Sequence, residues 1–129
     1  MALERINPEG LGQPIGPYVN AVKAGKLVFV FGQVAFGPDG QVVGVGDPEA
    51  QMVQIMESIG ANLRAAGATF ADVAKVTIFV TDMAHRVRLS PIRERYFQGS
   101  NPASTLVEVS ALAHPDLLIE VEAIAVVPG

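Results

Sequence analysis

Val73-Ala74-Lys75-Val76-Thr77-Ile78-Phe79-Val80-Thr81 is the stretch of this 129-residue chain that decides its fold. Its residues alternate in character, and a period of two predicts a β-strand with one face on a hydrophobic core. The predicted core face carries Ala74, Val76, Ile78 and Val80, and the opposite face carries Lys75, Thr77, Phe79 and Thr81. A sheet built on this strand needs a cover for one face, and the flanking sequence has to supply it.

Two helices are predicted on either side of this strand. In the first, Asp47 can cap the N-terminus, Pro48 suits the first position and Gly67 suits the end. Helical spacing predicts one buried stripe, made of Met52, Ile55, Met56, Ile59, Leu63 and Ala66. The polar residues beside it are expected to face water: Gln51, Gln54, Glu57, Ser58 and Arg64. The second helix is predicted to open at Ser90-Pro91, with a core side of Ile92, Arg95, Tyr96 and Phe97.

The remaining segments are predicted to be strands and turns. Residues 27–31 follow a turn at 23–26 and are apolar on both faces, so both faces are expected to be covered. Residues 41–43, after the turn Gly37-Pro38-Asp39-Gly40, are predicted to form a short strand. Alternation also predicts strands over 104–110 and 119–126. The chain is therefore predicted to be a single α+β domain over residues 1–129, with a mixed sheet and two helices on one face.

The second face of the predicted sheet allows two interpretations. It combines the polar residues Lys75, Thr77, Glu108, Glu120 and Glu122 with the apolar residues Phe79, Leu106, Ile124 and Val126. Such a face is either solvated, which is common in antiparallel sheets, or a partly buried contact between subunits. The composition favours the contact, because 50% of the residues are apolar and 17% are charged. We therefore expect an oligomer.

Composition also excludes several classes of function. The chain has no cysteine, which rules out disulfides and thiolate chemistry. A net charge of −4 is the wrong sign for a nucleic-acid partner. No run approaches the ~18 apolar residues of a membrane span, and the N-terminus lacks a signal-peptide pattern. His85 and His114 have no metal-ligand spacing and are expected at the surface. We expect a cytoplasmic protein with no metal, cofactor, nucleic acid or membrane partner.

Motifs along nearly the whole chain resemble the RidA/YjgF family of reactive-intermediate deaminases. These motifs are Ile15-Gly16-Pro17-Tyr18, Val28-Phe29-Val30-Phe31-Gly32-Gln33, Ala65-Ala66-Gly67, the block over 72–83, Tyr96-Phe97 with Pro102-Ala103, and Ile119-Glu120-Val121-Glu122-Ala123-Ile124-Ala125. The resemblance implies a chorismate-mutase-like α+β fold and a homotrimer with a central β-barrel. It also implies a small-molecule cleft at each subunit boundary and, for the deaminating members, hydrolysis of enamines or imines to keto acids and ammonia.

The resemblance assigns roles to six residues of the expected cleft. Tyr18 matches the cleft tyrosine, Gly32 allows close approach of the backbone, and Glu120 matches the acid that positions water. Two positions depart from the family pattern. Phe31 replaces the usual serine, and Ser104, followed by Thr105, replaces the arginine of Pro-Ala-Arg-Ser or Pro-Ala-Arg-Thr. A serine cannot reproduce the two parallel hydrogen bonds that a guanidinium makes to a carboxylate.

Three functions remain open from the sequence. The first is a small-molecule-binding homotrimer of a subgroup without the carboxylate-binding arginine, distinct from the 2-iminobutanoate/2-iminopropanoate deaminases. The second is an imine or enamine deaminase in which Arg88, Arg93 or Arg95 supplies the cation. The third is a regulatory or ligand-binding trimer without chemistry, or the ribonuclease activity of some relatives. The acidic isoelectric point, near 5.0, argues against the ribonuclease.

Overall fold

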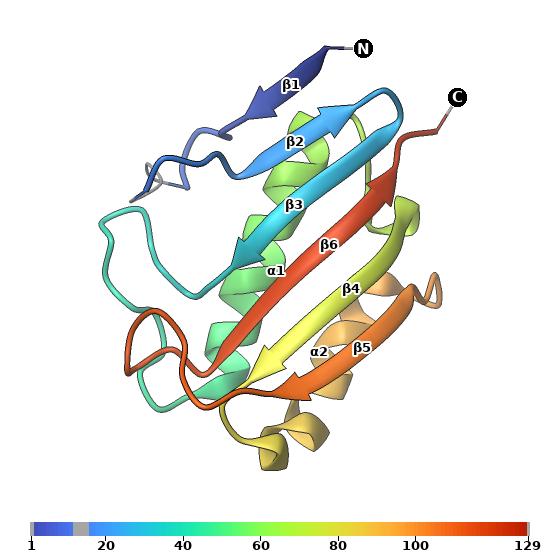
Figure 1. Cartoon of the computed structure of the whole chain (residues 1–129). Helices are drawn as coiled ribbons and strands as arrows, with labels where there is room; N and C mark the ends of the chain where they lie inside the picture. Colours follow the sequence, from blue (N-terminus) through green and yellow to red (C-terminus); the bar gives the residue numbers. More distant parts are fainter. Residues whose placement is uncertain (1, 12–15, 129) are drawn as a thin grey trace.

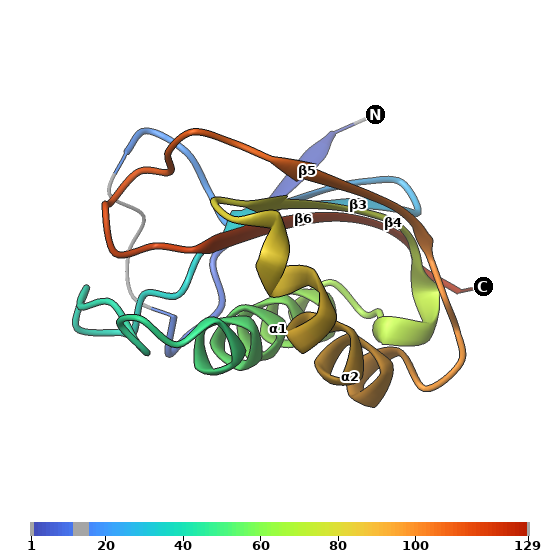
Figure 2. The same cartoon turned by 90° about the horizontal axis from the view of Figure 1, so that it is seen from below.

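The computed structural model describes residues 2–11 and 16–128, which form one sheet with both helices on the same side (Figures 1 and 2). The six-stranded sheet has the order β1-β2-β3-β6-β4-β5. Its strands are β1 (Leu3–Ile6), β2 (Ala21–Ala24), β3 (Leu27–Gln33), β4 (Val73–Val80), β5 (Ala103–Glu108) and β6 (Ile119–Val126). The helices are α1 (Pro48–Ala65) and α2 (Arg86–Phe97), each next to a 3₁₀ turn, η1 (Phe70–Asp72) or η2 (Met83–His85). The predicted α+β class is confirmed.

The sheet is mixed, and its parallel pair positions α2. The strands β2 and β3 form a hairpin, and the last strand of the chain, β6, lies between β3 and β4 with antiparallel pairing to both. Only β4 and β5 run parallel among the named strands. A parallel pair needs a crossover connection, and η2 with α2 provides it. The helix therefore lies directly beneath the β5 edge of the sheet (Figure 2).

The first helix forms as its sequence predicts. Asp47 Oδ1 accepts a hydrogen bond of 3.1 Å from Ala50 N, and Pro48 occupies the first turn. Gly67 follows the helix at a φ of +83°, a conformation that favours glycine. The predicted stripe of Met52, Ile55, Met56, Ile59, Leu63 and Ala66 is buried against the sheet.

Two residues of α1 and the start of α2 differ from the prediction. Gln51 and Ser58 are buried instead of facing water, because loops cross over this side of α1. The second helix begins at Arg86, four residues before Ser90-Pro91, because Asp82 accepts a hydrogen bond from Ala84 N and opens η2 earlier. In this register Leu89 is in the core, whereas Arg95 is exposed.

The strand assignments need four corrections. A register shift in β4 between Val73 and Lys75 leaves Ala74 exposed and buries Val73 instead. Residues 41–43 form no strand but a single bridge between Phe36 and Val42. Leu106 and Glu108 lie on the helix-covered face, because β5 pairs with β4 so that Leu106 opposes the buried Ile78. Finally, β3 is not covered on both faces within one chain.

The uncovered face of the sheet is rich in apolar side chains. Leu27, Phe29 and Val126 are each between 42% and 43% exposed, and Val107 is 36% exposed. Phe29 opposes Ile124 across the pairing of β3 with β6. Each of these residues points away from the two helices, so nothing within the described residues covers them. A face of this composition requires a partner or remains an exposed apolar patch.

Candidate functional site

Four of the residues that the sequence assigned to a site meet in one cleft. Tyr18, Phe31, Gly32 and Glu120 line a cavity of about 340 Å³ at the end of the sheet where β3 stops and β6 starts. The Tyr18 and Phe31 rings lie 5.1 Å apart at 45°, which makes one wall aromatic. Ile15, the first residue of the tyrosine motif, lies outside the described residues. The remaining wall is mostly apolar, as expected for a small-molecule site.

A bulge in β3 brings Phe31 and Gly32 into the cleft. The pairing with β6 is regular as far as Val30 opposite Ala123, and it resumes with Gln33 opposite Val121. Two residues of β3 therefore oppose one residue of β6, and the strand turns Gln33 into the core. Bulges of this kind re-aim side chains and are over-represented beside active sites. The Phe31 amide donates a hydrogen bond of 2.9 Å to the Asn20 carbonyl, which holds the bulge.

Glu120 is the titratable group of the cleft. Its neighbours Ile119 and Val121 are buried under the helices, so its own side chain lies on the uncovered face. Burial raises the pKa of Glu120, and the nearby Glu122 carboxylate raises it further. The carboxylate packs directly on Gly32, where any Cβ would collide with it. A half-buried carboxyl with a raised pKa is a stronger base than a solvated glutamate and is a candidate for accepting and returning a proton.

Replacing Glu120 with glutamine is expected to change how stability depends on pH. Because the pKa of Glu120 is higher in the folded chain than in the unfolded chain, ionisation costs native stability. Below both pKa values the wild type and Glu120→Gln should be equally stable. As pH rises through the window between the unfolded and folded pKa values, Glu120→Gln should become the more stable protein. Urea unfolding at pH 4 and pH 7 measures this, and an equal difference at both values would contradict it.

No sequence motif identifies the polar residues that support the cleft. Asn7 Oδ1 accepts hydrogen bonds from Asn20 N at 2.9 Å and from Asn20 Nδ2 at 3.0 Å. Gln33 Nε2 in turn donates to Asn20 Oδ1 at 3.4 Å. This group fixes Asn20, which lies two residues after Tyr18 and directly before β2. His114 also lines the cleft while remaining partly exposed at the surface. These partners are far apart in the sequence, and no spacing signals them.

Ser104 and Thr105 do not reach this cleft within the same chain. Ser104 opposes Val76 on β4 and so lies on the helix-covered side, whereas Thr105 opposes Thr77 on the uncovered face. Glu120 is on the uncovered face as well, but it lies on β6, with β4 between it and β5. Ser104 and Glu120 are therefore on opposite faces of one sheet. Within one chain these two positions therefore do not face the same cleft.

The structure distinguishes the three arginines that the sequence offered as replacements. Arg93 Nη2 donates a hydrogen bond of 2.9 Å to Ser104 Oγ. Arg88 Nε instead pairs with Glu49 Oε1 at 2.8 Å, on the side of α2 that faces α1. Arg95 is exposed and has no side-chain hydrogen bond or ion pair among the described residues. Of these three arginines, Arg93 is the one whose guanidinium contacts Ser104, the residue that stands in place of the family arginine.

The remaining features of the described residues concern metal ligands and membrane-spanning helices. Over residues 2–11 and 16–128, no group of three or more histidine, aspartate and glutamate side chains could hold a metal ion. In the part of the chain that the structure describes, no helix combines the length and apolar character that a membrane crossing needs.

The chain is similar to known proteins over nearly its whole length. The model of the family described as endoribonuclease L-PSP matches residues 11–127. A RutC family protein of Pyrococcus abyssi is 42% identical over 125 residues, covering 97% of this chain and 98% of that protein. The crystal structure of the Rid family protein YyfA from Yersinia pestis has a TM-score of 0.92 and 36% identity, covering 98% of this chain and all of that one. The YjgF gene product of Escherichia coli has a TM-score of 0.87 and 35% identity, with 95% of this chain and 98% of that chain covered.

Proposed function

Because the chain belongs to the endoribonuclease L-PSP family, which includes the RutC and RidA/YjgF proteins, we propose that it is a small-molecule-binding homotrimer. The observation that carries this proposal is the cleft in which Tyr18, Phe31, Gly32 and Glu120 meet. Its volume suits a metabolite, and it holds one carboxyl group able to exchange a proton. The position of Ser104 on the opposite face of the sheet supports a site completed by a second copy.

Glu120 gives this cleft the means to act on water. A carboxylate there can accept a proton from a water molecule as the water oxygen adds to an electrophilic carbon. The same carboxyl can then return the proton to a leaving nitrogen. For an imine, the carbon–nitrogen bond breaks and the products are a carbonyl compound and ammonia. The raised pKa of Glu120 supports the first transfer, because it makes the carboxylate a stronger base than a solvated glutamate.

Two departures from the family pattern indicate that the ligand differs from the 2-imino acids that the deaminating members hydrolyse. Phe31 stacks on Tyr18 and fills the cleft with an aromatic ring where a serine hydroxyl is usual. Ser104 has no charge to offer a carboxylate. We propose that the ligand presents a more apolar surface to the cleft than 2-iminobutanoate or 2-iminopropanoate does and that the chain belongs to a subgroup without the strand arginine.

Imine or enamine deamination with a displaced arginine is the second candidate. The contact between Arg93 Nη2 and Ser104 Oγ favours it, because a guanidinium lies where the family arginine would begin. The two candidates differ in one measurable property. A deaminase with Arg93 as the anchor would hydrolyse short 2-imino acids, whereas the first candidate would not.

Assembly is expected to depend on the uncovered face of the sheet. Phe29 is 42% exposed in a single chain and opposes Ile124 near the middle of that face. Phe29→Asp places a charge in the proposed contact and should give a monomer, because burying an unpaired charge costs several kcal/mol. Sedimentation equilibrium should report about three times the 13.6 kDa chain mass for the wild type and one chain mass for the variant.

Val87→Asp is the matched control for this experiment. Val87 is 78% exposed on α2, on the opposite side of the molecule from the sheet face. The same change of side chain there should leave the mass unchanged. A wild type that sediments as a monomer at micromolar concentration would refute the proposed trimer.

A further inference from the structure

One stripe of α2 collects positive charge beneath the edge of the sheet. Arg86, Ser90 and Arg93 recur at i, i+4 and i+7, a spacing that places them on one face of a helix. The structure shows that this face is turned toward β5, because Arg93 reaches Ser104 on that strand. All three residues line a groove of about 490 Å³ between the helix and the sheet. No residue of this groove belongs to the cleft that contains Glu120.

The floor of this groove is apolar. Ile78 from β4, Leu106 from β5 and Leu89 from α2 line it, and Ile78 and Leu89 are almost fully buried. The groove therefore has a dry surface along one side and two guanidinium groups along the other. That combination suits a ligand with an apolar body and an acidic end.

The charge in the groove is not neutralised by the described residues. No carboxylate there lies within ion-pair distance of Arg86 or Arg93, whereas Arg88 on the same helix has Glu49. Glu108, the acid on β5, accepts a hydrogen bond of 2.8 Å from the Met83 amide. Arg93 is partly buried, which lowers the pKa of its guanidinium, but arginine remains charged at any physiological pH. The hydrogen-bond acceptor of Arg93, the Ser104 hydroxyl, carries no compensating charge.

We propose that this groove binds the carboxylate of a small organic acid, with Arg93 and Arg86 as its cation pair, Ser90 as a neutral hydrogen-bonding group, and the Ser104 hydroxyl holding Arg93 at the edge of the groove. A carboxylate can accept two parallel hydrogen bonds from one guanidinium, and the apolar floor holds the body of the acid. This binding does not rest on the proposed function, because no residue that lines the groove lines the cleft that contains Glu120.

Isothermal titration calorimetry with three probes tests the groove. Benzoate has both a carboxylate and an apolar ring, benzamide has the same shape without the charge, and acetate has the charge without the ring. We expect benzoate to bind with saturation. Benzamide should bind at least roughly 10-fold more weakly, since hydrogen bonds to charged groups are worth ~1.5–3 kcal/mol. Acetate should also bind at least roughly 10-fold more weakly, because it has no ring to pack on the apolar floor. Equal affinity for benzoate and benzamide would overturn the proposal, as would no saturable benzoate binding at millimolar concentration.

Variants on one helix locate the binding. Arg93→Gln should weaken benzoate binding by roughly 10- to 150-fold, and Arg86→Gln by a smaller factor, because each removes one charged donor. Arg88→Gln is the matched control, because it removes the same charge from the same helix at a residue already paired with Glu49. Arg88→Gln should change the affinity for benzoate by no more than about 2-fold relative to the wild type, because an exposed ion pair contributes little. Equal losses in Arg88→Gln and Arg93→Gln would indicate nonspecific attraction and overturn the proposal. Circular dichroism confirms that each variant is folded.

The same samples separate this proposal from the proposed assembly. Every residue of the groove belongs to one chain, so benzoate binding does not require a second copy. A trimer that fails to bind benzoate would refute the groove alone. A monomer that binds it in an Arg93-dependent manner would refute the assembly alone.

Discussion

Purified wild-type protein is expected to hydrolyse 2-iminobutanoate and 2-iminopropanoate little faster than buffer does. The reason is the loss of the strand arginine, because removal of a desolvated charge contact costs ~2–5 kcal/mol, a factor of roughly 30 to several thousand. Arg93 contacts Ser104 from the adjacent helix, but its guanidinium starts from a different backbone position. A coupled assay in which an amino-acid oxidase supplies the imine measures the rate of its disappearance.

Three variants identify which substitution controls this rate. Ser104→Arg alone should recover little activity, because the Phe31 ring still packs on Tyr18 in the cleft. The double variant Phe31→Ser, Ser104→Arg should hydrolyse these imines well above the rate of the wild type, provided that Glu120 accepts the proton of the attacking water. Arg93→Gln is the control for the second candidate function. If the wild type deaminates these imines well and Arg93→Gln does not, the displaced arginine is the anchor and our first candidate is wrong.

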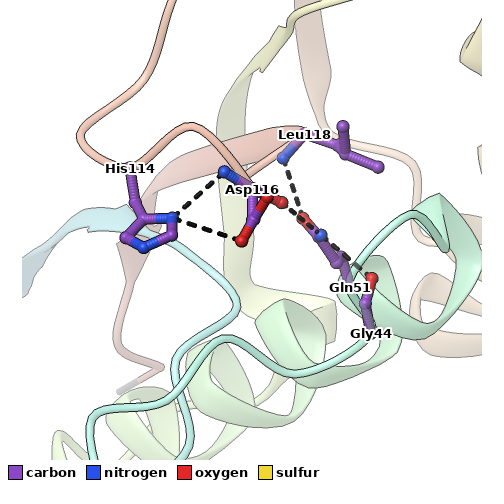
Figure 3. Close-up of polar contacts among 5 residues, drawn as sticks. All are labelled: Gly44, Gln51, His114, Asp116 and Leu118. Atoms are coloured by element: carbon purple, nitrogen blue, oxygen red, sulfur yellow. Dashed lines mark hydrogen bonds and ion pairs between the residues drawn. The ribbon is translucent and has the colours of Figure 1, made fainter.

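Replacing Gln51 with methionine is expected to cause the largest loss of stability among the variants considered. Gln51 is fully buried, and its amide joins two loop segments, one at Gly44 and one that contains Asp116 and Leu118 (Figure 3). Gln51 Nε2 donates to the Gly44 carbonyl at 3.1 Å and to the Asp116 carbonyl at 2.8 Å. Gln51 Oε1 accepts from Leu118 N at 2.8 Å. Methionine fills a similar volume but leaves three buried backbone groups unpaired, so we expect a loss of about 2–4 kcal/mol.

Gln54→Met provides the comparison for that measurement. Gln54 lies on the next turn of α1 and donates one hydrogen bond of 3.2 Å, to the Phe36 carbonyl. The same chemical change there removes one bond in a less buried place and should cost about 1 kcal/mol or less. Chemical unfolding of both variants at equal protein concentration gives the two values, since assembly also affects apparent stability. Equal losses would show that the three bonds of Gln51 do not stabilise the fold as a unit.

The sequence predicted most of the fold, because local signals set it. The cap at Asp47, the glycine at position 67 and the apolar stripe between them give α1 without any knowledge of the rest of the chain. The alternation of β4 gives a strand in the same way. The errors occur where distant segments decide the outcome. Gln51 looks like a surface residue on its own helix, and only the loops at Gly44 and Asp116 make it a buried one.

The structure brings some of the candidate site residues together and leaves others apart for a related reason. Tyr18, Phe31, Gly32 and Glu120 meet as the family resemblance implied. Ser104 does not join them, because the parallel register of β5 turns it toward α2. Arg86 was not among the candidate arginines, since its relation to Ser90 and Arg93 depends on where α2 begins. Helix starts are hard to place when Ser-Pro lies inside the helix, as it does here at residues 90–91.

The bulge at Phe31 and Gly32 has an evolutionary consequence. Sheet pairing continues on either side of it, through Val30 and through Gln33, so the pairing register does not depend on the side chain at position 31. Position 31 can therefore exchange a hydroxyl for a ring while the core residues of β3 stay in place. A change of ligand at this point of the chain does not require a change in the strand pairing. A lineage could thus acquire a new specificity here without passing through unstable intermediates.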